Sequence, residues 1–187
     1  MAIRQQRVSL RAACIVAAGW CGGAWAAPPA AEYQVKAAYL YNFGQFVEWP
    51  LQAYDSPSAP FVIGIVGEDP FGLILDEVIV GESLGGHKLV VKRFKTAADI
   101  SACNILFIGR SEAAHLDETL KALQGRSVLT VTDITGAESQ GAIISLVNEN
   151  NRIRMRINLA AARASHLVIS SKLLRPAEVV GNDGVPK

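Results

Sequence analysis

The sequence predicts an α/β fold in which a mainly parallel sheet is covered by helices on both faces and carries an antiparallel hairpin at its edge near the C-terminus. Three observations support this prediction. Residues 103–108 form a nearly uninterrupted apolar run that is too short for an ordinary helix, which is typical of a strand buried on both faces. Strand-like and helix-like segments alternate over residues 61–133, as in parallel sheets. Two strand-like segments on either side of residues 148–151 predict the hairpin.

The first 26 residues are typical of a secretory signal peptide. Three arginines precede an apolar stretch over residues 12–20, and residues 24–26 form a small-x-small cleavage site. The alternative is an uncleaved membrane anchor, because residues 12–31 carry no charge. The glycines, prolines and short apolar core favour cleavage after residue 26 and export to the periplasm.

The remainder has the length of one domain, and we predict a single α/β domain over residues 27–181 followed by a flexible tail over residues 182–187. Beyond residue 26 there are 15 basic and 17 acidic residues, a net charge of −2, which does not favour a nucleic-acid partner. Cys103 is the only cysteine there, so an internal disulfide is impossible. An exported chain without disulfides depends on its core, as bacterial periplasmic α/β domains do.

Residues 32–49 predict a long helix that is apolar on two adjoining faces. This segment holds six of the eleven aromatic residues found beyond residue 26. Such a helix is either sunk in the core or shared between the core and a partner chain, and the sequence leaves both interpretations open. The aromatic side chains that would contact a partner are Tyr39, Phe43, Phe46 and Trp49. Pro50 is expected to end the helix.

Four strands and three helices are expected in alternation after this helix. The expected strands are residues 61–66, 87–94, 103–108 and 127–133. The expected helices are residues 69–80, 99–102 and 111–123. Asp69 suits the N-cap of the first helix, with Pro70 as its first residue, and Ser111 suits the N-cap of the third. The inward-facing residues of the third helix are expected to be Ala114, Leu116, Leu120 and Leu123.

The hairpin is expected to pair residues 142–147 with residues 152–157. In its second arm Arg152, Arg154 and Arg156 share one face. Three guanidinium groups on one face repel each other, so they need carboxylates, an anion or a partner surface. The alternative is that these charges protect an exposed sheet edge from aggregation.

The last elements are expected to be short. Asn158 suits the N-cap of an alanine-rich helix through residue 164. Residues 167–174 are compatible with a final strand or with the start of a helix.

The strongest catalytic hypothesis is a serine hydrolase. Residues 109–113 follow a strand as a nucleophile elbow does, and Asp133 and His166 come later in the Ser-Asp-His order of α/β-hydrolases. The chain is short for that fold, Ala113 stands where the motif has glycine, and no glycine-rich oxyanion motif precedes Ser111. A helix N-cap, which contributes about 1 kcal/mol, explains Ser111 more simply, and we expect no enzymatic activity.

The sequence also offers no pattern for a metal or a cofactor. The three histidines are far apart in sequence and Cys103 has no nearby ligand. Gly64 and Gly67 match neither the dinucleotide fingerprint nor a phosphate loop. We therefore expect neither a bound metal nor a cofactor.

Several blocks of sequence are distinctive in combination. They are residues 33–43 (YQVKAAYLYNF), 46–50 (FVEWP), 64–72 (GIVGEDPFG), 151–159 (NRIRMRINL) and 169–174 (ISSKLL). In this order, and over nearly the whole chain beyond residue 26, they resemble the YfiR-like family of bacterial periplasmic proteins.

The resemblance implies a regulator with no chemistry of its own. Studied members of the family restrain an inner-membrane diguanylate cyclase from the periplasm, lower cyclic-di-GMP signalling and biofilm formation, and tend to be dimers; others are thought to serve membrane sensor kinases. Regulation in the family is linked to paired cysteines, and the single Cys103 makes such control doubtful here. On this interpretation the aromatic helix and the arginine strand contact the partner, together with Ser170, Ser171 and Lys172.

The main alternative is a periplasmic small-ligand binding module that feeds a membrane kinase or a transporter. Ligands of α/β sheets bind beyond the carboxyl ends of the strands. The corresponding residues here are Asp69, Phe71, Arg110 and Asp133.

Overall fold

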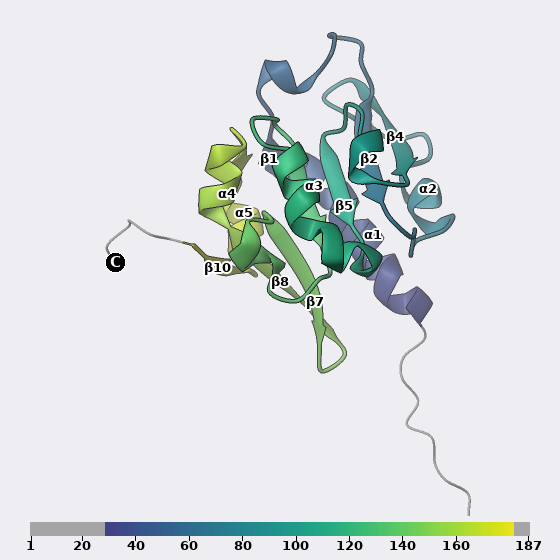
Figure 1. The fold of residues 1–187 in the computed structure, drawn as a ribbon. Helices are drawn as coiled ribbons and strands as arrows, with labels where there is room; N and C mark the ends of the chain where they lie inside the picture. Colours follow the sequence, from purple (N-terminus) through teal and green to yellow (C-terminus); the bar gives the residue numbers. More distant parts are fainter. Residues whose placement is uncertain (1–28, 182–187) are drawn as a thin grey trace, which may run out of the picture.

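A computed structural model describes residues 29–181 (Figure 1). The main sheet has the strand order β10-β8-β7-β6-β5-β2-β4-β3, and β1 and β9 form a separate two-stranded sheet. The main-sheet strands are β2 (Phe61–Val66), β3 (Ser83–Leu84), β4 (His87–Phe94), β5 (Ile105–Ile108), β6 (Leu129–Thr132), β7 (Ile144–Glu149), β8 (Arg152–Asn158) and β10 (Glu178–Val180). The small sheet pairs β1 (Val47–Glu48) with β9 (Val168–Ile169).

The described α-helices are α1 (Pro29–Phe46), α2 (Ile74–Ile79), α3 (Leu116–Ala122), α4 (Leu159–Ala164) and α5 (Ser171–Leu174). Short 3₁₀ helices cover Leu51–Ala53, Ala97–Asp99, Arg110–His115 and Ala137–Gln140. In the part of the chain that the structure describes, no helix combines the length and apolar character that crossing a membrane requires. The predicted signal peptide and the predicted tail lie outside the described residues.

The predicted α/β class is confirmed. Neighbouring strands from β4 to β7 pair in parallel, and β7 and β8 form the antiparallel hairpin. Asn150 and Asn151 turn the hairpin with φ values of 53° and 59°, the left-handed conformation that asparagine tolerates. The hairpin is not the outermost element, because β10 pairs in parallel with the end of β8.

β5 lies in the middle of the sheet and is buried at all four positions, as predicted. Asn104 precedes the strand, and its main chain is bonded to both neighbouring strands, through Val62 O and Leu129 N. The Asn104 side-chain oxygen accepts a hydrogen bond from Val62 N at 2.8 Å, and its amide nitrogen donates to Ala53 O at 3.2 Å. A polar side chain can therefore be buried at the start of the central strand.

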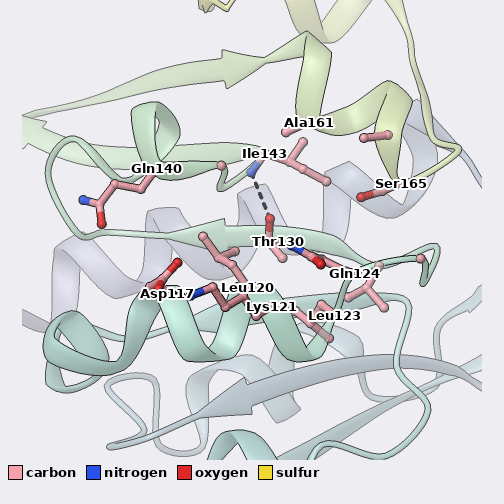
Figure 2. A pocket seen from close by; sticks show the side chains of 14 residues that line it. Asp117, Leu120, Lys121, Leu123, Gln124, Thr130, Gln140, Ile143, Ala161 and Ser165 are labelled. Atoms are coloured by element: carbon pink, nitrogen blue, oxygen red, sulfur yellow. Dashed lines mark hydrogen bonds and ion pairs between the residues drawn. The ribbon is translucent and has the colours of Figure 1, made fainter.

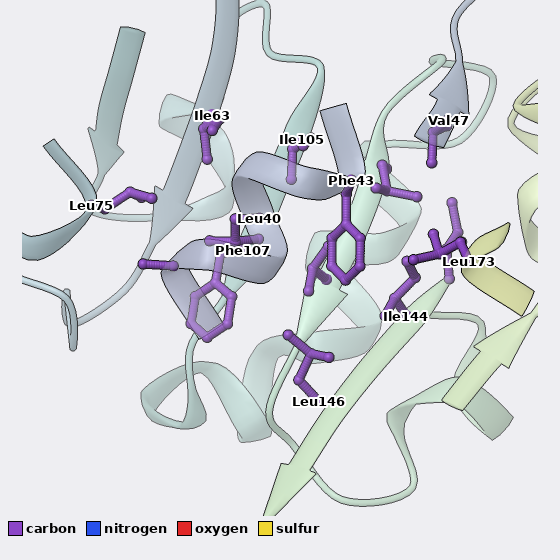
Figure 3. Close-up of a cluster of buried hydrophobic side chains, with 14 of the residues drawn as sticks. Leu40, Phe43, Val47, Ile63, Leu75, Ile105, Phe107, Ile144, Leu146 and Leu173 are labelled. Carbon is purple, nitrogen blue, oxygen red and sulfur yellow. The ribbon is translucent and has the colours of Figure 1, made fainter. Parts of the chain in front are cut away.

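Helices cover both faces of the sheet. On one face Leu40 and Phe43 of α1 pack with side chains of β2, β5 and β7, as Figure 3 shows. On the other face Leu116 of α3 packs in a second cluster with Leu106 and Ile108 of β5. Burying each such side chain stabilises the fold by about 1.5–3 kcal/mol.

Three predicted helices have different bounds in the structure. The helix expected over residues 32–49 ends at Phe46, because Val47 pairs with Ile169 in the small sheet. The helix expected from Asp69 begins at Ile74, since Asp69 Oδ1 accepts bonds from Phe71 N and Gly72 N and so closes a turn. The short helix expected over residues 99–102 is a 3₁₀ turn at Ala97–Asp99.

The helix predicted over residues 111–123 is α-helical only from Leu116. Ser111 does not cap it; its Oγ instead accepts a hydrogen bond from Glu68 N at 3.0 Å. Ala114 is exposed and Thr119 is buried, contrary to the predicted inward face, because the first turns are 3₁₀ and shift the side chains around the axis.

Of two local predictions near the C-terminus, the Asn158 cap is confirmed, whereas the strand within residues 167–174 is not the final one, because β10 follows it. Asn158 caps α4, its side chain accepting a hydrogen bond from Ala161 N at 2.9 Å. Residues 167–174 contain both of the elements considered, strand β9 and helix α5.

Candidate functional site

The carboxyl ends of the parallel strands are filled by the protein's own side chains. Asp133 follows β6, and its Oδ2 accepts hydrogen bonds from Lys36 Nζ at 2.8 Å and from Tyr33 Oη at 2.9 Å. The side chains of Lys36 and Asp133 are both fully buried, and Arg110 Nε lies 3.3 Å from Asp133 Oδ2. The first turns of α1 thus close the place where an α/β sheet of this kind would bind a ligand.

Glu32 connects this buried pair to the surface. Its carboxylate accepts hydrogen bonds from Lys36, from Arg110 at 3.1 Å and from Asn148 at 2.7 Å. Burial alone would raise the pKa of Glu32, but the hydrogen bonds from Asn148 and Lys36 outweigh it and hold the pKa below its usual value. Burial and the neighbouring Asp133 raise the pKa of Tyr33, so its hydroxyl stays protonated and remains a donor. We call Glu32, Tyr33, Lys36, Arg110 and Asp133 the strand-end network.

The crevice between the loops that follow β2 and β5 is also closed. Gly67 has φ +84°, and a Cβ there would lie 2.5 Å from Ser111 Oγ and 2.7 Å from Glu112 Cγ. Together with the bond from Glu68 N to Ser111 Oγ, this close approach joins the loops that follow the two strands. The topological switch point of the sheet therefore holds a side chain of the protein.

The four predicted ligand-pocket residues lie at this edge but do not surround an open space. Asp69 is paired with Arg93 at 2.6 Å. Phe71 is 2% exposed and packs edge-on against Tyr33 and Phe107. Arg110 and Asp133 belong to the strand-end network, and none of the four lines a hollow described below.

Two of the three hydrolase residues have other partners. Ser111 Oγ accepts a hydrogen bond from Glu68 N, and Asp133 Oδ2 accepts hydrogen bonds from Lys36 Nζ and Tyr33 Oη. His166 lies after α4, where it lines a hollow with residues that include Gln52 and Ser127. Among residues 29–181, neither Asp133 nor His166 is hydrogen-bonded to Ser111.

The four aromatic residues proposed for partner binding have different environments. Phe43 is fully buried and stacks on Tyr39 at a centroid distance of 5.9 Å. Core side chains enclose the Phe43 ring, so in this structure it has no exposed surface with which to contact a partner. Trp49 is half-buried, packs edge-on against Phe61, and donates from Nε1 to the carbonyl of Asn104 at 3.2 Å. Tyr39 and Phe46 are also half-buried, so part of each ring is accessible.

The structure brings Phe46 together with the serine and lysine residues predicted near the C-terminus. Ser170 N donates to Phe46 O at 2.9 Å beside the β1–β9 pair, and Ser171 and Lys172 are exposed next to it. Val168 of β9 is 59% exposed. We call Phe46, Val168, Ser170, Ser171 and Lys172 the β1–β9 surface.

An apolar hollow of about 280 Å³ adjoins this surface. It is lined by Leu159, Ala162, Arg163, Leu167, Val168, Ile169 and Leu174. Because Val168 belongs to both, a protruding apolar side chain of a partner could enter the hollow while contacting the β1–β9 surface.

The arginine strand divides into two parts. Arg156 lies among carboxylates of the same chain, 2.7 Å from Glu149, 3.0 Å from Glu178 and 3.9 Å from Glu138. Arg152 and Arg154 are exposed and form no salt bridge within residues 29–181. Only these two remain available for a partner or an anion, and edge protection stays the alternative for them.

A larger hollow lies between α3, β6 and α4, and Figure 2 shows its lining. Its volume is about 310 Å³, and its walls combine apolar side chains such as Leu120 and Ile143 with polar ones such as Gln124, Gln140 and Ser165. Thr130 Oγ1 at its base accepts a hydrogen bond from Ile143 N at 2.9 Å. No local pattern predicts this hollow, because it forms where segments distant in sequence meet.

Comparison with known proteins identifies one family. The sequence profile of a family described as YfiR/HmsC-like matches residues 33–178. A search of curated proteins found no match. The fold is similar to the crystal structure of a conserved domain protein from Vibrio cholerae O1 biovar El Tor, with a TM-score of 0.53 and 15% identity. The similarity covers 79% of this chain and 59% of that one, so the present chain spans little more than half of its length.

Proposed function

Because this chain belongs to the YfiR/HmsC-like family of non-catalytic periplasmic regulators, we propose that it binds and restrains an inner-membrane diguanylate cyclase or sensor protein. It would act on the periplasmic part of that protein and lower cyclic-di-GMP signalling. The observation that carries this proposal is the family match, which extends from the first turns of α1 to the start of β10.

The strand-end network supports a role in binding a protein. Enzymes and ligand carriers of this fold class keep the carboxyl ends of the strands open. Here Lys36 and Asp133 occupy that place as a fully buried pair, and Ser111 bridges the switch point. Activity would then depend on contacts made by the outer surface.

The β1–β9 surface is the proposed main contact. Val168 supplies exposed apolar area, Phe46 adds part of its ring, and Lys172 adds a positive charge at the rim. Interfaces commonly combine an apolar centre with a polar rim in this way. Arg152 and Arg154 of β8 are proposed as further polar contacts, and a homodimer through Tyr39 and the adjoining part of α1 is proposed as the active form.

The test is repression of cyclic-di-GMP by surface variants in a strain that lacks the gene. Val168→Asp places a charge at the centre of the β1–β9 surface and is expected to abolish repression. Leu51→Asp, at a site that is 89% exposed and outside every proposed contact surface, is the matched control and is expected to repress normally. Equal repression by both variants, at equal protein levels in the periplasm, would contradict the assignment of this surface.

A second candidate function, small-ligand sensing that feeds a membrane kinase or a transporter, is favoured by the hollow between α3 and α4. Its volume of about 310 Å³ is at the lower end for ligand sites. A ligand at 100 times its dissociation constant would stabilise the protein by about 2.7 kcal/mol, which thermal unfolding detects. Ala161→Leu, which fills the hollow, should abolish that stabilisation; stabilisation that survives Ala161→Leu would place the ligand elsewhere.

A further inference from the structure

The outer edge of β4 is a largely unpaired border of the main sheet. On its inner side β4 pairs with β2 from Leu89 to Phe94. On its outer side β3 pairs only with His87 and Lys88, and Leu89 N donates to Glu82 O at 3.2 Å. Within residues 29–181 no other strand lies beyond β4, which Figure 1 shows at the margin of the fold beside α2.

The backbone of this edge presents free hydrogen-bonding groups. Phe94 O accepts a bond from Gly67 N, so the main chain of Phe94 faces β2, whereas that of Leu89 faces outward to Glu82. Successive residues of a strand direct their main-chain groups to opposite sides, so Val91 and Arg93 face outward like Leu89. Their N–H and C=O groups have no backbone partner in the described chain. Such a row is a template for one more strand.

On β4 and directly after it, the charges that form no salt bridge within residues 29–181 are positive, although the acidic Glu82 lies at the β3 end of the edge and Glu77 on α2 is also exposed. Lys88, Lys92 and Lys95 are exposed and form no salt bridge in the described part of the chain. Arg93 differs, because its guanidinium is bound by Asp69 and Asp76. A second copy paired across this edge would bring lysines close to lysines, which is unfavourable, whereas an acidic segment would neutralise them.

Apolar surface lies at both ends of the helix that packs on β4. Leu73 and Val80 flank α2 and are 75% and 77% exposed. Val90 and Val91 on the strand itself are half-buried. Alternate side chains of an added strand could cover this apolar area while the others reach the lysines.

We propose that the outer edge of β4 binds an extended acidic segment of a partner protein, which adds to the sheet as a further strand. Val91 and Arg93 provide main-chain hydrogen bonds, and Lys88 and Lys92 pair with acidic side chains of the segment. The inference deepens the proposed function and rests on it for the source of the segment, the periplasmic part of the membrane protein.

The test uses a short capped peptide of alternating glutamate and valine as the probe. Binding is expected to slow hydrogen exchange at the amides of Val91 and Arg93 by at least about tenfold in the full chain. A peptide with proline in place of valine cannot form the strand and should leave these amides unchanged. Equal binding of both peptides, or binding without protection of these amides, would overturn the proposal.

Charge reversal at the lysines of the edge provides a second part of the binding test. Lys88→Glu with Lys92→Glu turns two attractions into repulsions and should weaken binding about tenfold, while thermal unfolding stays unchanged. The matched control is Arg163→Glu with Arg175→Glu, two exposed positions without a salt bridge among residues 29–181. If the control variant weakened peptide binding to the same degree, the effect would come from net charge alone, and this would refute the site.

Two outcomes separate this inference from others. Protection of Val91 and Arg93 that rises with protein concentration, without peptide, would assign the edge to a second copy and overturn the acidic segment. Loss of peptide binding in the Lys88/Lys92 variant together with normal repression in the cell would refute the biological role of the edge. The proposed function itself would stand in that case, because repression measures it independently.

Discussion

Lys36→Met tests the buried ion pair on which closure of the strand ends depends. The substitution keeps most of the side-chain volume and removes the charge. It leaves the Asp133 carboxylate fully buried, with Tyr33 and the more distant Arg110 as its remaining partners. Removing one partner of a buried pair costs about 3–5 kcal/mol. Because Tyr33 and Arg110 remain, we expect a loss of about 3 kcal/mol in the free energy of unfolding, which is a large part of the stability of a typical domain.

The assay is urea unfolding followed by circular dichroism, with Lys121→Met as the matched control. Lys121 pairs with Asp117 at 2.6 Å, but the two side chains are 66% and 75% exposed. Solvent screens this pair, so the control should lose no more than about 1 kcal/mol. The double variant Lys36→Met with Asp133→Leu should recover much of the loss, because no buried charge is left alone. A loss below about 1 kcal/mol in Lys36→Met, equal to that of the control, would refute the reasoning.

Three further predictions concern the thiol, a helix cap and acid sensitivity. Burial raises the pKa of Cys103 to about 11, so its thiol should react with iodoacetamide at pH 8 about a hundredfold more slowly than after unfolding in urea; equal rates would show that the site is open. Asn158→Ala removes the bond from Ala161 N and the bond that Nδ2 donates to Glu138 O, and should cost about 1–2 kcal/mol in urea unfolding, whereas Asn158→Asp keeps the cap and should lose less; equal losses would contradict the cap. The pKa of Glu32 is held below its ordinary value of 4.5, so its contribution to stability is present above that pH and is lost as the pH falls through the lowered pKa. Glu32→Gln should therefore lose less stability than the native protein between about pH 5 and about pH 3, and parallel curves would refute this role.

Local patterns predicted the elements that local residues determine. β2 and β5 are apolar throughout and bounded by turn residues, so their positions could be read directly. The hairpin and the Asn158 cap likewise depend on neighbouring residues. These features could be predicted because the local conformational preferences of the residues agree with the tertiary structure.

The missed features depend on contacts between distant residues. β1 is two residues long and forms because Val47 pairs with Ile169. A strand of this length has no hydrophobic periodicity from which it could be predicted. Ser111 has the sequence context of a helix N-cap, yet its hydroxyl oxygen accepts a hydrogen bond from the main-chain nitrogen of Glu68 in another loop.

The sequence indicated where the candidate site residues lie, but not how their side chains pack. Asp69, Phe71, Arg110 and Asp133 lie at or near the ends of the strands, but a ligand site there stays a prediction. The filling of the strand ends by Lys36 could not be foreseen, because the two members of the ion pair are 97 residues apart. The composition of α1 indicates more apolar side chains than one helix face can bury. Only the packing shows that Phe43 is fully buried while Tyr39 and Phe46 are half-buried.

The most direct test of the proposed role is the cellular level of cyclic-di-GMP after deletion of the gene, followed by restoration with the full chain or with a chain that lacks residues 2–26. We predict that deletion raises cyclic-di-GMP and that only the full chain lowers it again, because restraint of the cyclase requires export. An unchanged level after deletion, or equal restoration by both forms at matched expression, would contradict periplasmic restraint of a diguanylate cyclase.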